Sequence, residues 1–177
     1  RDTGHQATVG VMVHELGHLI FRLPDLYDTD STSNGAGAWC YMSYGSWGQA
    51  SDDPYSGQHP VNPGAWVREA MGWSLPATGS GNFSLSSVGD TTNSATNTLV
   101  RLNTSSSTEH FLIENRAMVG YDRGLYGLFD GNAGGLGIWH VEDSGSSNRL
   151  DKRRLADVEE ADGDTSAYKP TNLWYLG

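Results

Sequence analysis

The sequence predicts an α+β fold in which a helical N-terminal part is followed by a β-rich region. Residues 7–20 carry apolar side chains at helical spacing and contain no proline, which favours an amphipathic helix. Beyond Pro76 the composition shifts to glycine, serine, threonine and asparagine, and helix signals disappear. Short apolar and β-branched segments then alternate with turn clusters, a pattern that is typical of strands.

The chain divides at about residue 76. Residues 1–76 are expected to hold the first helix, an Asp-containing loop, a Met-containing turn and a second short helix between Pro63 and Trp73. Residues 77–177 are expected to form a β-rich region that packs on the first part or follows it. The strands predicted in that region are residues 83–85, 98–102, 110–114 and 136–141.

The first predicted helix carries His14-Glu15-Leu16-Gly17-His18. Residues four apart differ by about 40° around a helix, at roughly 100° per residue, so both imidazoles point the same way. Such a pair suits a tetrahedral zinc ion, whose Zn–N distances are roughly 2.0–2.1 Å. Glu15 is turned away from direct ligation but can reach a water on that ion and take its proton. The spacing therefore predicts a zinc site with Glu15 as general base.

Several further segments resemble the M6 family, the immune inhibitor A group of secreted bacterial zinc endopeptidases. The segments that carry this resemblance, from about Val9 to Asp164, are the zinc helix, Leu23-Pro24-Asp25-Leu26-Tyr27-Asp28-Thr29, Met42-Ser43-Tyr44-Gly45-Ser46-Trp47, the helix ending in Gly72-Trp73, His110-Phe111-Leu112-Ile113-Glu114-Asn115-Arg116, Gly137-Ile138-Trp139-His140-Val141 and Glu159-Glu160-Ala161-Asp162-Gly163. The resemblance implies a metzincin-like catalytic domain that hydrolyses peptide bonds in proteins.

The resemblance also implies a third metal ligand, for which Asp25 is the candidate. In the metzincin pattern this ligand follows the second histidine by six residues, a position that Pro24 occupies here. Asp25 comes one residue later, and Arg22 stands near the expected turn glycine. We therefore expect a loop one residue longer, in which a left-handed arginine would be strained by roughly 1 kcal/mol. The alternatives for the third ligand are Asp28, Asp30, His59 or a residue outside this chain.

The resemblance assigns Met42 and Tyr44 to the same site. A methionine turn passes beneath the metal in metzincin-like peptidases, and a thioether can fill an irregular gap there. Tyr44 matches a tyrosine that could stabilise the developing oxyanion. The alternatives are an ordinary core methionine and a packing aromatic. Gly17 costs the helix about 1 kcal/mol relative to alanine, which indicates that another group packs closely against it.

The composition excludes several function classes. The chain has 21 acidic and 11 basic side chains, a net charge of −10, and no basic stripe, which argues against nucleic-acid or anionic-membrane binding. No apolar run approaches the roughly 18 residues of a membrane span. Cys40 is the single cysteine, so no internal disulfide is expected and we interpret Cys40 as a small buried residue. Together with the resemblance, this acidity indicates a secreted, extracellular protein.

Two acidic clusters are candidates for calcium, Asp25/Asp28/Asp30 and Glu159/Glu160/Asp162/Asp164. For the second cluster a solvated acidic turn explains the sequence equally well.

Few residues precede His14, so we expect that a sheet in front of the zinc helix is missing from this chain.

The sequence thus predicts a secreted zinc metalloendopeptidase that acts on protein or peptide substrates, with an inhibitory propeptide as a further candidate partner. One alternative is a non-catalytic, metal-stabilised surface or matrix-binding module derived from a peptidase. Another is a purely structural β-rich domain, for which no bound transition metal is expected.

Overall fold

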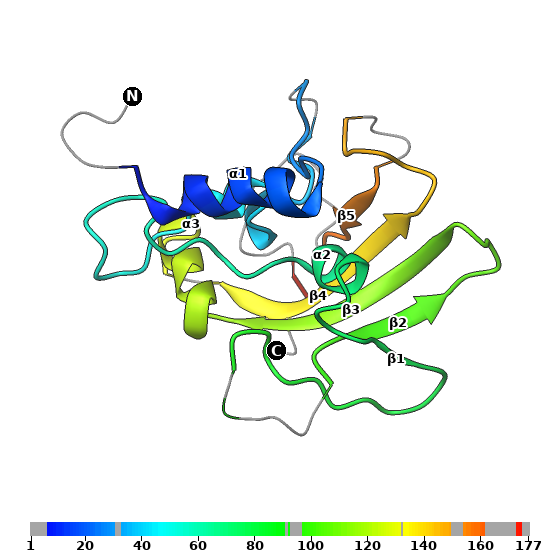
Figure 1. Ribbon diagram of the computed structural model, residues 1–177. Helices are drawn as coiled ribbons and strands as arrows, with labels where there is room; N and C mark the ends of the chain where they lie inside the picture. The colour runs from blue at the N-terminus through cyan, green and yellow to red at the C-terminus, as the bar shows by residue number, and fades with distance from the viewer. Residues whose placement is uncertain are drawn as a thin grey trace.

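The computed structural model describes residues 7–30, 33–90, 92, 97–131, 133–149, 154–161 and 173–174. The elements follow one another as α1 (Val9–Phe21), η1 (Gly37–Trp39), η2 (Tyr44–Trp47), α2 (Ala65–Ala70), β1 (Ala77–Thr78), β2 (Val100–Asn103), β3 (Glu109–Ala117), η3 (Gly120–Gly124), α3 (Leu125–Leu128), β4 (Gly134–Glu142) and β5 (Ala156–Val158) (Figure 1). Helices dominate the first part and strands the second, so the predicted α+β class is confirmed.

The five strands form one mixed sheet in the order β1-β2-β3-β4-β5. β1 and β2 are parallel, and the other neighbours are antiparallel. The predicted strands 98–102, 110–114 and 136–141 correspond to β2, β3 and β4. The predicted strand 83–85 is wrong: Phe83 and Ser84 are exposed, and Leu85 makes only a single bridge to Asn97. β1 and β5 were not predicted, because two or three residues are too few to show an alternating pattern.

One face of the sheet packs against the helical part of the chain. Alternate residues of β3 are buried, namely His110, Leu112, Glu114 and Arg116, and Trp139 of β4 lies opposite Leu112. α1 and α2 lie on the same side of the sheet (Figure 1). One hydrophobic cluster draws residues from both sides of position 76; among its largest members are Leu26, Trp39, Met42, Leu112, Trp139 and Val141.

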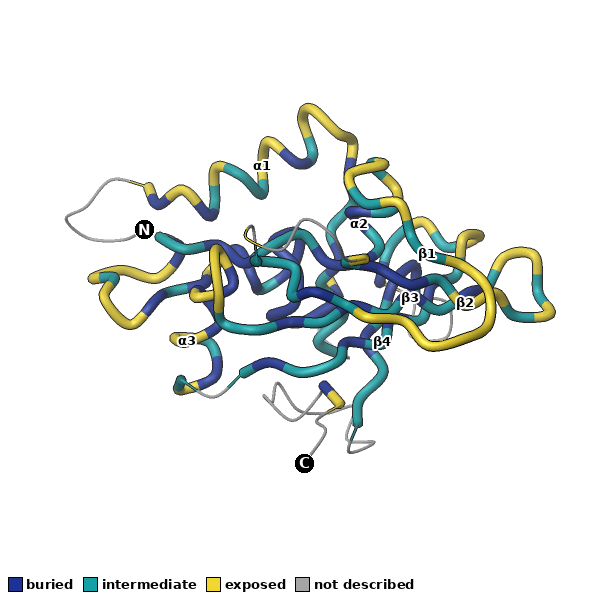
Figure 2. The backbone as a smooth tube through the Cα atoms, turned by 90° about the horizontal axis from the view of Figure 1, so that it is seen from below, coloured by how far each residue is buried: buried dark blue, intermediate teal, exposed yellow. Residues whose placement is uncertain are grey.

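α1 is only shallowly embedded in the protein, and most of its length is exposed or half-buried (Figure 2). Gly10 and Gly17 are its buried residues. Several side chains of the predicted apolar face, such as Met12 and Ile20, are about half exposed, at 49% and 60%. Within the described part of the chain, no helix combines the length and apolar character that crossing a membrane would require.

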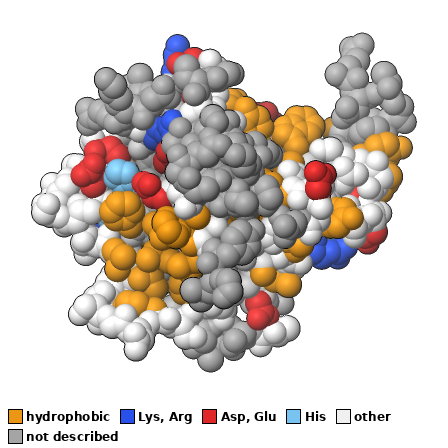
Figure 3. Space-filling view, turned by 180° about the vertical axis from the view of Figure 1, so that it is seen from behind, with side chains coloured by type: hydrophobic (Ala, Val, Ile, Leu, Met, Phe, Trp, Pro, Cys, Tyr) orange, Lys and Arg blue, Asp and Glu red, His pale blue; other side chains and the backbone are white. Residues whose placement is uncertain are grey.

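The opposite face of the sheet is partly covered. On this side Phe111 stacks on the ring of His140, with ring centroids 4.9 Å apart. The imidazole of His140 lies 3.6 Å from Oε1 of Glu109 and 3.5 Å from Oε1 of Glu159. The view from behind shows hydrophobic, acidic and histidine side chains side by side (Figure 3).

Candidate metal centre

Three side chains from α1 and the following loop converge on one point. The Nε2 atoms of His14 and His18 are 3.2 Å apart, and each is 3.1 Å from Oδ1 of Asp25. Within the ranges that the structure describes, this is the one group of three or more His, Cys, Asp or Glu side chains whose ligand atoms meet so closely. The structure therefore brings together the three residues that the sequence analysis selected.

Backbone carbonyls hold both histidines in a single tautomer. Nδ1 of His14 lies 2.9 Å from the carbonyl oxygen of Tyr41, and Nδ1 of His18 lies 2.6 Å from that of Leu23. Because a carbonyl oxygen can only accept a hydrogen bond, each Nδ1 donates its proton to it. In the neutral imidazoles both Nε2 atoms are then acceptors, and their lone pairs meet at Asp25.

This donor set fits a zinc ion. Two imidazole lone pairs and a carboxylate oxygen at 3.1–3.2 Å from one another are stabilised when a cation lies among them. Ligand atoms on a tetrahedral zinc ion are about 3.3–3.4 Å apart, which is close to the spacing here. Hydrogen bonds from the other imidazole nitrogens to backbone carbonyls are also common around metal-binding histidines.

Arg22 ends α1 in the left-handed conformation, with φ 55° and ψ 30°. Its backbone N–H donates to the carbonyl oxygen of His18 at 3.0 Å, and the backbone N–H of Leu23 donates to the carbonyl oxygen of Gly17 at 3.2 Å. This is the arginine turn expected for a loop with one additional residue. It directs the chain back toward the helix, so that Asp25 meets the histidines.

The far side of the Asp25 loop is attached to the segment that contains Met42. The N–H of Leu26 donates to the carbonyl oxygen of Met42 at 2.9 Å, and Leu26 is fully buried. Asp25 therefore lies between Leu23, which is bonded to α1, and Leu26, which is bonded to Met42. Attachment on both sides limits the positions that its carboxylate can take.

Met42 is fully buried against α1. A Cβ atom on Gly17 would lie 2.4 Å from Sδ of Met42, which is too close for any side chain without movement. The close packing predicted from Gly17 is thus confirmed. Met42 lies against the helix that carries both histidines, and the assignment of this segment as a methionine turn stays a prediction.

A cleft of about 470 Å³ opens beside the three converging side chains, and its lining residues are Val11, His14, Glu15, Tyr27, Asp28, Thr29, Ser43, Tyr44, Ser46 and Trp47. Glu15 is on the exposed side of α1, next to His14. Tyr44 lines the same cleft from η2. A group bound in this cleft would therefore contact Glu15, Tyr44 and the His14 side of the centre.

Tyr27 belongs to this site but was not selected from the sequence. Its ring stacks on His14 with centroids 6.2 Å apart and an interplanar angle of 24°, and it lies 6.2 Å from the ring of Tyr44. Its phenol group interacts with the carboxylate of Asp25. Burial, followed by the negative charge of Asp25, raises the pKa of Tyr27. The available signal in the sequence was its position two residues after a candidate ligand.

The alternative ligands named from the sequence lie outside the cluster. The carboxylate of Asp28 accepts hydrogen bonds from the backbone N–H groups of Asp30 and Ser33, at 3.1 and 2.8 Å, and is therefore engaged by backbone groups that follow it in the chain. Nδ1 of His59 lies 2.5 Å from Oδ2 of Asp53. Neither Asp28 nor His59 competes with Asp25 for the two histidines.

The two acidic clusters considered for calcium have different surroundings. In the first, Asp25 points at the histidines and Asp28 is engaged by backbone N–H groups. In the second, burial, followed by the charge of Asp157, raises the pKa of Glu160 to about 7. Asp162 and Asp164 lie outside the described residues. Both calcium assignments stay predictions.

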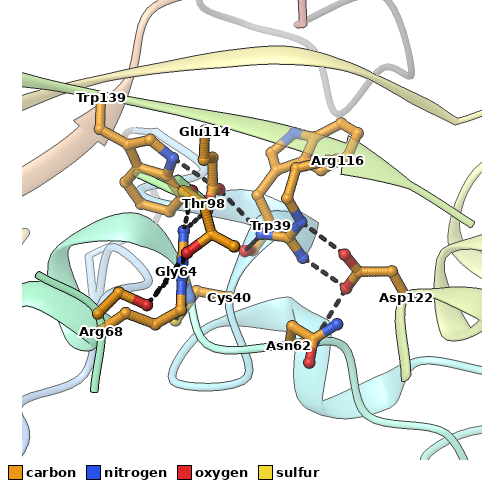
Figure 4. A network of polar contacts seen from close by, with 11 residues as sticks. Trp39, Cys40, Asn62, Gly64, Arg68, Thr98, Glu114, Arg116, Asp122 and Trp139 are labelled. Carbon is orange, nitrogen blue, oxygen red and sulfur yellow. Dashed lines mark hydrogen bonds and ion pairs between the residues drawn. The ribbon is translucent and has the colours of Figure 1, made fainter. Parts of the chain in front are cut away.

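A buried network of charged side chains joins α2, β3 and η3 (Figure 4). The guanidinium of Arg116 binds both carboxylate oxygens of Asp122, at 2.7 and 2.6 Å, and Oε1 of Glu114 at 3.0 Å. Arg68 binds the other oxygen of Glu114 at 2.7 Å, and Nε1 of Trp139 donates to Oε1 at 2.9 Å. Burial alone would lower the pKa of Arg116, but Asp122 and Glu114 raise it above its ordinary value. All four charges are therefore paired inside the protein.

Cys40 lies in the core, as expected. Its sulfur accepts hydrogen bonds from the backbone N–H groups of Gly64 and Met42, at 3.3 and 3.4 Å. Burial raises the pKa of the Cys40 thiol to about 11. A thiol in this state is a structural group, because the reactive thiolate is suppressed at neutral pH.

Comparison with protein families gives a match over residues 3–74 to the immune inhibitor A peptidase M6, catalytic domain. The matched segment contains the converging ligands His14, His18 and Asp25, as well as Glu15 and Met42. Comparison with curated proteins gives no match. Over residues 3–74 the chain is therefore similar to the catalytic domain of M6 peptidases, and this similarity supports a metallopeptidase.

Proposed function

We propose that this protein is a zinc-dependent endopeptidase in which His14, His18 and Asp25 hold the metal. The observation that carries the proposal is the convergence of two Nε2 atoms and one carboxylate oxygen within 3.2 Å of one another. Because both Nδ1 atoms are already bonded to backbone carbonyls, the lone pairs at this point are directed by the fold. The substrates of a peptidase are proteins or peptides.

In this proposal each residue of the cleft has a separate role in the hydrolysis of a peptide bond. A bound zinc ion supplies a water of lowered pKa and polarises the scissile carbonyl. Glu15 accepts the proton of the attacking water and later delivers it to the amine that leaves. Tyr44 donates a hydrogen bond to the oxygen on which negative charge develops. Tyr27 keeps Asp25 oriented through its hydroxyl group.

We also propose that the protein acts outside the cell. The support is its net charge of −10, together with its M6 segment. A strongly negative charge favours solubility and disfavours binding to nucleic acid. An inhibitory propeptide stays a prediction, as does a structural calcium ion.

The first experiment counts zinc in the purified protein after dialysis. We expect about one zinc per chain, because three protein ligands and a water complete a catalytic site. The Asp25→Ala variant should lose the zinc, whereas Asp30→Ala, an exposed position in the same loop, should retain it. A wild-type protein that binds no zinc, or an Asp25→Ala variant that keeps it, would contradict the ligand assignment.

The second experiment separates catalysis from metal binding. The Glu15→Gln variant should keep its zinc but lose turnover of a fluorogenic protein substrate. A chelator such as 1,10-phenanthroline should abolish the wild-type activity, and added zinc should restore it. If the wild type binds zinc without any turnover, the site belongs to a metal-stabilised binding module instead.

A further inference from the structure

Arg116 reaches from β3 to a segment that packs against the candidate metal centre. This segment, Trp39–Met42, lies more than 70 residues earlier in the chain. Nη1 of Arg116 donates to the carbonyl oxygen of Trp39 at 2.7 Å, and the guanidinium lies 6.0 Å from the centre of the Trp39 ring. Both side chains are buried, so water does not compete for this contact.

The Trp39–Met42 segment contacts the candidate metal centre at three points. The carbonyl oxygen of Tyr41 accepts the Nδ1 proton of His14 at 2.9 Å. The carbonyl oxygen of Met42 accepts the N–H of Leu26, the residue after Asp25, at 2.9 Å. The sulfur of Met42 packs against Gly17 between the two histidines. A shift of this segment would therefore move His14 and Asp25 together.

The guanidinium is itself held rigidly in place. Asp122 binds it through two parallel hydrogen bonds, and Glu114 adds a third contact. Oδ1 of Asp122 also accepts the backbone N–H of Asn62 at 2.9 Å. Because two carboxylates hold one planar donor through three hydrogen bonds, the direction of the hydrogen bond to Trp39 is defined by the β-rich half of the protein.

We propose that Arg116 is a positioning residue for the metal centre: through the Trp39–Met42 segment it sets the place of His14 and of the Asp25 loop, and so strengthens metal binding. The inference rests on the proposed metal site and extends it to a residue that touches no ligand. It also gives the buried ion pairs a role in function, with the β-rich half of the protein as the support of the site.

The test compares Arg116→Lys with Arg68→Lys. Lysine at position 116 keeps the positive charge beside Glu114 and Asp122 but cannot reproduce the forked contacts to Asp122 and Trp39. Arg68 is the matched control, because it is also buried and paired with Glu114. Its side-chain hydrogen bonds go to Ser74, Thr98 and Glu114 rather than to the Trp39–Met42 segment. The measurements are the zinc dissociation constant by competition with a fluorescent chelator and the visible spectrum of the Co²⁺-substituted protein.

We expect Arg116→Lys to weaken zinc binding by about tenfold and to change the Co²⁺ spectrum. This is the lower end of the range for direct partners of metal ligands, because Arg116 acts on the ligands only through the Trp39–Met42 segment. Arg68→Lys should stay within about threefold of the wild type, as expected for a pair that does not contact the site. Zinc binding by Arg116→Lys like that of the wild type would overturn the inference. An equal loss in both variants would do the same, because it would indicate general loosening of the core.

Circular dichroism should first show that each variant is folded. If Arg116→Lys does not fold, Asp122→Asn takes its place, since it retains an oxygen for the N–H of Asn62 and weakens the hold on the guanidinium. It should then bind zinc at least about threefold more weakly than Arg68→Lys, and equal binding would overturn the inference. A wild-type protein without zinc would instead refute the proposed function itself.

Discussion

Gly17 and Met42 are in such close contact that a Cβ atom on residue 17 would lie 2.4 Å from the methionine sulfur. Gly17 lies between the two histidines in sequence, and the carbonyl oxygen of Met42 holds Leu26 of the Asp25 loop. The absence of one side chain thus allows the helix and the turn to approach closely enough to share a site.

Gly17→Ala should destabilise the protein by about 1 kcal/mol, because overpacking outweighs the gain in helix propensity. In a Met42→Ala background the same substitution should stabilise, since the sulfur is gone and only the propensity gain of about 1 kcal/mol remains. A double-mutant cycle from urea denaturation measures this change of sign. Additive effects of the two substitutions would show that the contact carries no energy.

Arg22→Gly should stabilise the protein by about 0.5 kcal/mol. The left-handed conformation costs an ordinary residue roughly 1–2 kcal/mol, and the larger entropy of glycine in the unfolded chain offsets part of the relief. Arg22→Ala is the control, because it removes the exposed side chain but keeps the Cβ atom and hence the strain. The comparison uses the free energy of unfolding, and a glycine variant less stable than the alanine variant would contradict it.

Tyr27→Phe should weaken zinc binding by about tenfold while leaving the protein folded. The substitution removes the hydroxyl group that interacts with Asp25 and retains the ring that stacks on His14. Competition with a chelator gives the dissociation constant. If affinity is unchanged, the orientation of Asp25 comes from its backbone attachments alone.

Tyr44→Phe should lower the catalytic rate and leave zinc affinity unchanged, in contrast to Tyr27→Phe. Its zinc affinity should equal that of the wild type, whereas kcat for a protein substrate should fall by about 100-fold, the usual loss for one oxyanion donor. Steady-state kinetics on zinc-loaded protein measures this. A normal kcat would assign Tyr44 to packing against Tyr27.

Glu160→Gln should raise the melting temperature at about pH 8 and leave it unchanged at about pH 4. Burial, followed by the charge of Asp157, raises the pKa of Glu160 to about 7 in the folded protein. The folded state therefore binds this proton more tightly than the unfolded chain does, and stability is lost as the pH rises from the unfolded pKa through about 7. Glutamine does not ionise, so the variant avoids the loss. Equal melting temperatures at both pH values would contradict the raised pKa.

Much of the fold class followed from local patterns. The helix came from apolar spacing and the absence of proline, and the observed Val9–Phe21 differs from the expected range by two residues at the start and one at the end. Three of the four predicted strands were found because β-branched and apolar residues cluster in them. The predicted strand 83–85 failed because a local pattern does not show whether a partner strand is available.

The candidate site could also be predicted only in part from local sequence patterns. Local sequence was enough to predict that His14 and His18 share one helical face and that Glu15 lies next to His14, because helix geometry repeats every 3.6 residues. It also indicated, through Gly17, that another group must pack there. The remaining features became known only from the tertiary structure: the approach of Asp25 to both histidines, the stacking of Tyr27 on His14, and the hydrogen bond from Arg116 to Trp39. These contacts join different segments of the chain, and they form only when packing of the whole core makes up for the strain and the buried charges that they bring.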